Sequence, residues 1–102
     1  MTVYILNSMT IHDRAEYDRY LKAFMPVFRK FNGSVLAAQD CTVAVEGYWP
    51  YDRTILLSFP SREDAQRWID SSEYQAIVGH RHAGTRSNVV MLDGLQRAKE
   101  PA

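Results

Sequence analysis

RTILLSFPSREDAQRWID, residues 53–70, predicts a buried strand that passes directly into an amphipathic helix. Its first half alternates with the period of two that is typical of a strand, with large apolar side chains at Ile55, Leu57 and Phe59. Pro60 cannot donate to a strand ladder, and Ser61 stands three residues before Asp64, a spacing typical of a capping box. We therefore expect the strand to end at Pro60 and a helix to begin near Arg62.

The composition indicates one small domain. The chain has 102 residues, and its 12 Lys and Arg balance 12 Asp and Glu, so the formal net charge is zero. We expect a single domain over residues 1–95 and a flexible tail over residues 96–102. A zero net charge gives no support to nucleic-acid binding and favours self-association.

Neither secretion nor membrane insertion is indicated. Cys41 is the one cysteine, so no intramolecular disulfide can form. The N-terminal residues lack a basic segment followed by a long apolar run, and no apolar stretch approaches the ~18 residues of a membrane span. The sequence predicts a cytoplasmic protein without a membrane partner.

Periodicity also predicts the elements on either side of this strand and helix. Strands are expected at residues 2–9, 34–39 and 86–93, and helices at residues 13–31 and 73–83. Residues 42–48 either continue the second strand past a bulge at Asp40 and Cys41 or form a short separate strand. Pro26 should kink the first helix or divide it in two.

This order of elements predicts an α+β, ferredoxin-like βαββαβ domain with a four-stranded antiparallel sheet and both main helices on one face. Apolar residues on the strands leave neither face of the sheet polar, among them Tyr4, Leu6, Leu56, Val89 and Met91. We therefore expect a homodimer in which two sheets pack face to face, with a cleft left between sheet and helices.

Four segments carry a resemblance to a known family: FNGSVLA (31–37), VEGYWPYDRTILLSFPSREDAQRW (45–68), SSEYQAIVGHR (71–81) and SNVVMLDG (87–94). In this order and spacing they resemble the domain-of-unknown-function 1330 family over nearly the whole chain. That family is similar to the dimeric α+β barrel proteins, which include small monooxygenases, muconolactone isomerase-like enzymes and ligand-binding modules. The resemblance implies a fold and a dimer but no particular reaction.

The same resemblance carries over to single positions, which are Glu46, Arg53, Tyr74 and Arg81. Ser72 stands where the family commonly has proline, so the following helix lacks the preset φ that proline gives to its first position. We expect this change to loosen the start of the helix without moving Tyr74.

Glu46 and Arg53 are the first candidate pair, because Glu46 interrupts an apolar run and Arg53 follows it across a turn. Both could lie in the cleft and contact a polar ligand, with Glu46 as general base if burial raises its pKa. The alternative is a cross-strand ion pair.

Tyr74 and Arg81 are the second pair, seven residues apart on one helical face. They could offer a hydroxyl and a charge to an anionic or carbonyl ligand; the alternative is a partly buried tyrosine and an arginine that snorkels to solvent near the helix end. Tyr17 belongs to an aromatic stripe that should form the core, although its hydroxyl could line the cleft.

His80 is a candidate acid or base because the unperturbed imidazole pKa is near neutrality; the alternative is an exposed histidine in the last helical turn. His80 and His82 point roughly 200° apart in a helix, so they cannot chelate one ion. We expect no metal and no cofactor.

No stretch specifies a reaction, since no phosphate loop, nucleophile elbow or CxxC motif occurs. The leading hypothesis is a cytoplasmic homodimer that binds a small carbonyl-bearing or aromatic molecule in its cleft. Its expected ligand contacts are Tyr17, Arg53, Tyr74 and Arg81. The alternatives are a cofactor-independent isomerase or monooxygenase-like enzyme, in which Glu46 or His80 moves a proton, and a non-catalytic dimerisation module.

Overall fold

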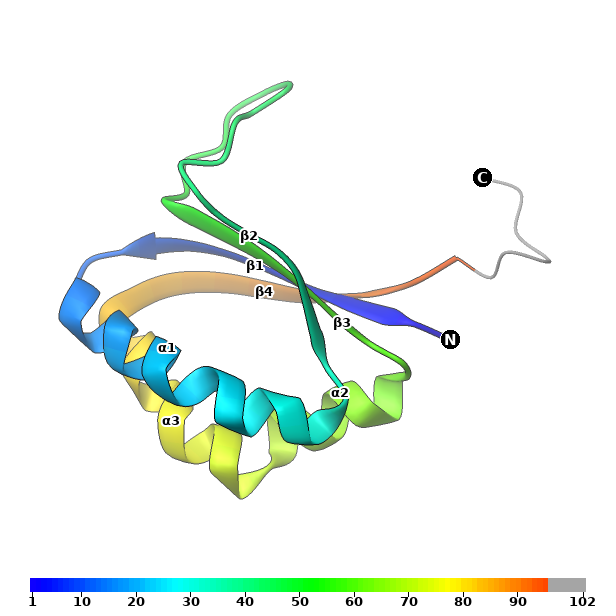
Figure 1. Cartoon of the computed structure of the whole chain (residues 1–102). Helices are drawn as coiled ribbons and strands as arrows, with labels where there is room; N and C mark the ends of the chain where they lie inside the picture. The colour runs from blue at the N-terminus through cyan, green and yellow to red at the C-terminus, as the bar shows by residue number, and fades with distance from the viewer. Residues whose placement is uncertain (96–102) are drawn as a thin grey trace.

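The computed structural model describes residues 1–95, which form a four-stranded antiparallel sheet with three α-helices on one of its faces (Figure 1). The strands are β1 (Val3–Ile11), β2 (Ser34–Asp40), β3 (Arg53–Phe59) and β4 (Thr85–Asp93). The helices are α1 (Arg14–Phe28), α2 (Arg62–Asp70) and α3 (Ser72–Gly84), and a 3-10 turn, η1 (Arg29–Phe31), follows α1. The tail predicted at residues 96–102 lies outside the described residues.

The strand order is β2-β3-β1-β4, so β1 pairs with both β3 and β4. This is the predicted ferredoxin-like arrangement. Side chains alternate between the two faces of a strand, so Val3, Ile5 and Met9 of β1 face the helices and are fully buried. Leu6 and its cross-strand neighbours Leu56 and Val90 lie on the opposite, uncovered face. The sheet thus has one covered and one open side.

Each helix begins at a short polar residue that caps it. The side chains of Asp13, Ser61 and Ser71 accept hydrogen bonds from backbone N–H groups in the first turns of α1, α2 and α3. Asn32 ends η1 in the left-handed conformation, at φ 65°. The start of α2 predicted from the capping spacing at Ser61 is therefore confirmed.

The strand predicted at residues 42–48 is wrong. Cys41 takes a left-handed conformation, φ 53°, and its N–H donates to the carbonyl of Asp52 at 2.8 Å. This bond closes the chain at the ends of β2 and β3, so the residues between them leave the sheet as a projecting loop (Figure 1). Val45 in this loop is 97% exposed.

Two smaller expectations are also corrected. The pairing of β2 with β3 is irregular between Val35 and Ala37, not at Asp40 and Cys41. Pro26 lies inside α1, which continues past it to Phe28 and is not divided. Because a proline removes only one backbone hydrogen bond of the helix, the packing of the aromatic stripe can hold the helix together.

Two glycines of α3 give a matched test of helix packing. A Cβ at Gly84 would lie 2.7 Å from the carbonyl oxygen of Asp13 and 2.8 Å from the backbone nitrogen of Tyr17, whereas a Cβ at Gly79 would meet nothing within 4 Å. We expect Gly84→Ala to lower the free energy of unfolding by about 1–3 kcal/mol through overpacking. Gly79→Ala should raise it by about 0.5–1 kcal/mol, because alanine is the better helix former.

Urea unfolding followed by tryptophan fluorescence measures both variants. A Gly84→Ala protein as stable as the unmodified chain would show that α1 and α3 do not approach this closely.

Candidate functional site

A cavity of about 190 Å³ lies between the helix-covered face of the sheet and the helices. Its walls are mainly apolar and come from all four strands and all three helices, with Ile5, Phe24, Leu57 and Trp68 among them. An apolar cavity of about 150 Å³ can hold a benzene molecule, so this one has room for a single substituted ring. Exposed residues of the lining mark its mouth, among them Met25 (36%), Val35 (42%) and Val89 (48%).

Arg81 is the most deeply buried charged group at this cavity. It lies on α3 with only 6% of its surface exposed, and its Nη2 donates to the hydroxyl of Tyr74 at 3.1 Å. Its guanidinium carbon lies 5.8 Å from the centre of the Tyr20 ring, within reach of a cation–π interaction. Burial raises the pKa of Tyr20, so this phenol stays neutral beside the guanidinium. Tyr74 and Arg81 thus share one helical face, as predicted, whereas the alternative of an Arg81 that snorkels to solvent is wrong because the side chain is buried.

Three buried side-chain atoms of the described residues have no hydrogen-bond partner: Asn7 Oδ1, Trp68 Nε1 and Arg81 Nε. All three residues line the cavity. Buried polar atoms are normally paired, and an exception calls for an explanation such as a functional role or a group that binds there. Two N–H donors and one carbonyl acceptor without a partner within residues 1–95 thus belong to residues of the cavity wall.

Asn7 is the lining residue that sequence reasoning missed. A signal was present, since Asn7 is the one polar residue in the alternating helix-facing series Val3, Ile5, Asn7 and Met9 of β1. A lone amide in a core-facing series needs a partner, and the chain between residues 1 and 95 supplies none for its oxygen.

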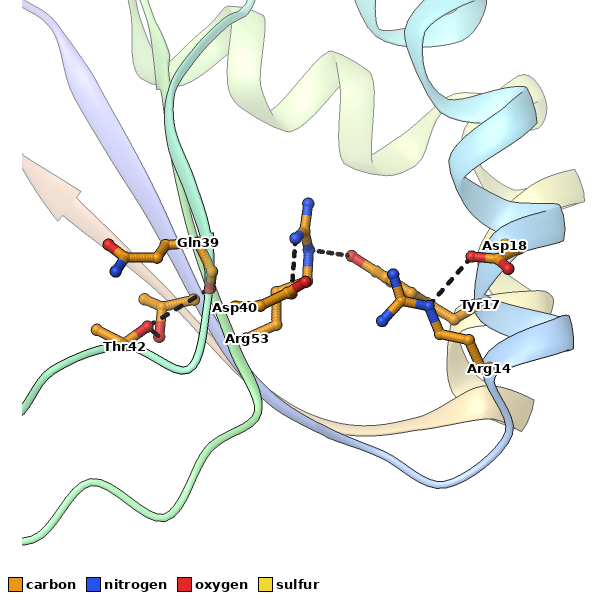
Figure 2. Close-up of polar contacts among 8 residues, drawn as sticks. Arg14, Tyr17, Asp18, Gln39, Asp40, Thr42 and Arg53 are labelled. Carbon is orange, nitrogen blue, oxygen red and sulfur yellow. Dashed lines mark hydrogen bonds and ion pairs between the residues drawn. The ribbon is translucent and has the colours of Figure 1, made fainter.

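Arg53 also lines the cavity, but its charge is balanced (Figure 2). Its Nη1 donates to Asp40 Oδ1 at 2.8 Å, and its Nε donates to the hydroxyl of Tyr17 at 3.1 Å. Burial opposes the charged form of Arg53, yet Asp40 and Tyr17 hold its pKa above the usual value. The hydrogen bond from Arg53 lowers the pKa of Asp40, and burial raises that of Tyr17. Tyr17 itself is fully buried and is not among the residues that line the cavity, so it contacts Arg53 and not the cavity.

Glu46 lies away from this cavity. It is exposed in the loop between β2 and β3, and Arg53 binds Asp40 instead of it. Both sequence-based placements of Glu46, in the cleft and in a cross-strand ion pair, needed residues 42–48 to run along the sheet. Because the chain closes at Cys41 and Asp52, neither placement occurs.

His80 faces α1 and not the cavity. Its Nδ1 lies 2.8 Å from Glu16 Oε2, and its side chain is 44% exposed. This contact is the main cause of the lowered pKa of Glu16. His80 thus forms a polar link between two helices, and the described cavity lining contains no carboxylate, imidazole or thiol.

No group of three or more His, Cys, Asp or Glu residues within residues 1–95 is placed to hold a metal ion. Over the same residues, no helix has the length and apolar character needed to cross a membrane.

Comparison with solved structures identifies proteins with the same fold. The protein RPA0582 from Rhodopseudomonas palustris, of unknown function, aligns with a TM-score of 0.80 at 20% identity, over 93% of this chain and 83% of that one. SnoaB from Streptomyces nogalater, a cofactor-independent oxygenase, aligns with a TM-score of 0.69 at 13% identity, over 97% and 98%. A dimeric ferredoxin-like protein of unknown function from Jannaschia sp. CCS1 aligns with a TM-score of 0.66 at 15% identity, over 92% and 100%.

At these identities the likeness establishes the fold alone. No curated protein matches the chain. The sequence profile of the domain of unknown function DUF1330, however, matches residues 2–95, the whole of the sheet and its helices. The chain therefore belongs to the DUF1330 family, and its fold is that of the ferredoxin-like α+β proteins.

Proposed function

We propose that this protein binds a small aromatic or carbonyl-bearing molecule in the cavity between its sheet and its helices. The observation that carries the proposal is a mainly apolar cavity with exposed residues at its mouth, whose lining residues hold three buried polar atoms without a partner among residues 1–95. Small-molecule sites typically combine predominantly apolar walls with a few convergent polar groups.

The chemistry of the lining sets what can enter. Aromatic rings from three helices, those of Tyr20, Phe24, Trp68 and Tyr74, offer flat apolar surface to a ring or a conjugated system. Arg81 and Tyr74 are the polar contacts within reach of such a molecule. Arg53 adds a further polar group to the lining, and its hydrogen bonds to Tyr17 and Asp40 fix the position of its guanidinium.

The protein acts, in this proposal, as a homodimer joined through the open face of the sheet. That face carries the apolar side chains of Tyr4, Leu6, Leu56, Val90 and Leu92, of which Val90 and Leu92 are about half exposed, at 49% and 50%. A contiguous apolar surface of this kind marks an interaction site. The Jannaschia protein, which shares the fold, is dimeric. A cytoplasmic location stays a prediction from the sequence.

A second candidate function is cofactor-independent oxygenation or isomerisation, favoured by the shared fold of SnoaB. It is the weaker candidate, because the groups expected to move a proton, Glu46 and His80, lie outside the described cavity lining. Glu46→Gln and His80→Ala that both leave any discovered turnover intact would remove those two residues from catalysis. A third possibility, a dimerisation module without a ligand, leaves the unpartnered atoms of the cavity unexplained.

Substitutions at two exposed alanines test whether a neutral aromatic probe binds in the cavity. Ala38 on β2 lines the cavity, while Ala76 on α3 does not. We expect indole to bind the unmodified protein and Ala38→Leu to weaken it about tenfold, because overfilling a packed site costs roughly 1–3 kcal/mol. Ala76→Leu is the control and should bind indole normally. Ligand-observed NMR titration measures all three, and equal affinities for indole would place its site elsewhere.

Two neighbouring valines of β4 test the dimer. Val89 and Val90 are equally exposed, at 48% and 49%, but Val89 faces the cavity and Val90 the open side of the sheet. Val90→Lys should convert the dimer to a monomer, because it buries an unpaired charge in the contact. Val89→Lys should leave the dimer intact. Light scattering after size exclusion reports both masses, and a monomeric unmodified protein would contradict the face-to-face arrangement.

A further inference from the structure

We infer that the ligand of this cavity is a small organic monoanion whose carboxylate pairs with Arg81. The inference rests on the proposed function of the cavity and adds the charge and the anchoring residue of the ligand. It depends on three features of the described residues: the burial of Arg81, the balance of the neighbouring charges, and the unpaired atoms of the cavity wall.

The burial of Arg81 is the first feature. Arginine is almost never fully buried unless it is paired. Moving its charge out of water costs free energy, which hydrogen bonds and an opposite charge in the protein must offset. Five arginines within residues 1–95 are more exposed than Arg81, and each of them nevertheless pairs with a carboxylate. They are Arg14, Arg19, Arg53, Arg62 and Arg67. Arg81 is 6% exposed, yet its polar partner among the same residues is the neutral hydroxyl of Tyr74. The buried guanidinium of Arg81 thus has no anionic partner among residues 1–95.

The charge balance of the cavity is the second feature. The two arginines that line the cavity differ in whether a carboxylate neutralises them. The charge of Arg53 is cancelled by Asp40 at 2.8 Å. The lining contains no carboxylate, and Tyr20 is kept neutral by burial. One positive charge, that of Arg81, is therefore left over, and one negative charge on the ligand neutralises it.

The unpaired atoms are the third feature, because they match the oxygens of a carboxylate. Arg81 Nε and Trp68 Nε1 are both N–H donors without a partner in residues 1–95, and an ionised carboxylate is an acceptor with two oxygens. Arginine is the side chain best shaped to bind a carboxylate through two hydrogen bonds. Asn7 Oδ1 remains as an acceptor for a hydroxyl elsewhere on the ligand. A hydroxylated single-ring acid carries acceptors for the two donors and a donor for the amide oxygen, and a single ring fits a cavity of about 190 Å³.

A pair of probes that differ in charge alone tests the inference. 4-Hydroxybenzoate is an anion at pH 7, and 4-hydroxybenzamide has the same ring and hydroxyl but is neutral. We expect the full-length protein to bind the benzoate at least about tenfold more tightly, because hydrogen bonds to charged groups are the stronger ones. Isothermal titration calorimetry gives both affinities.

Variants of Arg81 then test whether this residue causes the tighter binding of 4-hydroxybenzoate. Arg81→Met removes the charge but keeps an apolar stem, and should abolish the preference for the benzoate while the benzamide still binds. Arg81→Lys keeps the charge and should retain part of the preference. Arg29→Met, at an exposed arginine of η1, is the control and should retain all of it.

The outcomes separate the inference from the proposed function beneath it. Equal binding of both probes by the unmodified protein overturns the inference but leaves the cavity as a site for a neutral molecule. Failure of both probes and of indole to bind overturns the two together. If Arg81→Met does not fold, the comparison of the two probes on the unmodified protein and on Arg81→Lys still decides the question.

Discussion

The packing of one tryptophan holds the helices on the sheet. Trp68 of α2 lies 5.4 Å from Phe28 of α1 and 5.5 Å from Phe59 of β3, measured between ring centroids, and 4.3 Å from Tyr74 of α3. Aromatic pairs at these separations add to the stabilisation gained from buried area alone. One side chain thereby ties a strand and three helices together, and the geometry of the cavity depends on it because Trp68 also forms part of the cavity wall.

The same arrangement explains why the space is not filled. Phe59, at one end of β3, packs against Trp68 and Phe28, whereas Arg53, at the other end, faces the helices with a polar side chain. Arg53 needs Asp40 and Tyr17 as partners, and Arg81 on α3 brings a second guanidinium into the region. Buried charges with their partners cannot interdigitate as closely as aliphatic side chains do. The cavity thus lies where Arg53 of the sheet and Arg81 of α3 both enter the space between the sheet and the helices.

Membership of the DUF1330 family and the ferredoxin-like fold leave the reaction open, because one such fold supports oxygenases and proteins of unknown function alike. The site carries the functional argument instead. Its lining is rich in aromatic surface and hydrogen-bond donors and lacks, within the described residues, a group to take up a proton.

The sequence by itself determined the local structure of this protein. The alternation through Ile55, Leu57 and Phe59, followed by Pro60 and a serine cap, predicted β3 and α2 because strand and helix periods and caps are local properties. The spacing of Tyr74 and Arg81 likewise predicted that they share a helical face, on which the structure brings their side chains into contact.

Only the tertiary structure decided which residues meet across elements. Glu46 and Arg53 are close in sequence, yet the bond between Cys41 and Asp52 expels the loop that carries Glu46, and Arg53 pairs with Asp40 on the neighbouring strand. Asn7 lines the cavity because β1 is one of the two central strands of the sheet and turns this residue toward the helices. Such contacts depend on strand register and loop closure between distant residues, and a periodic pattern within one segment carries no information about either.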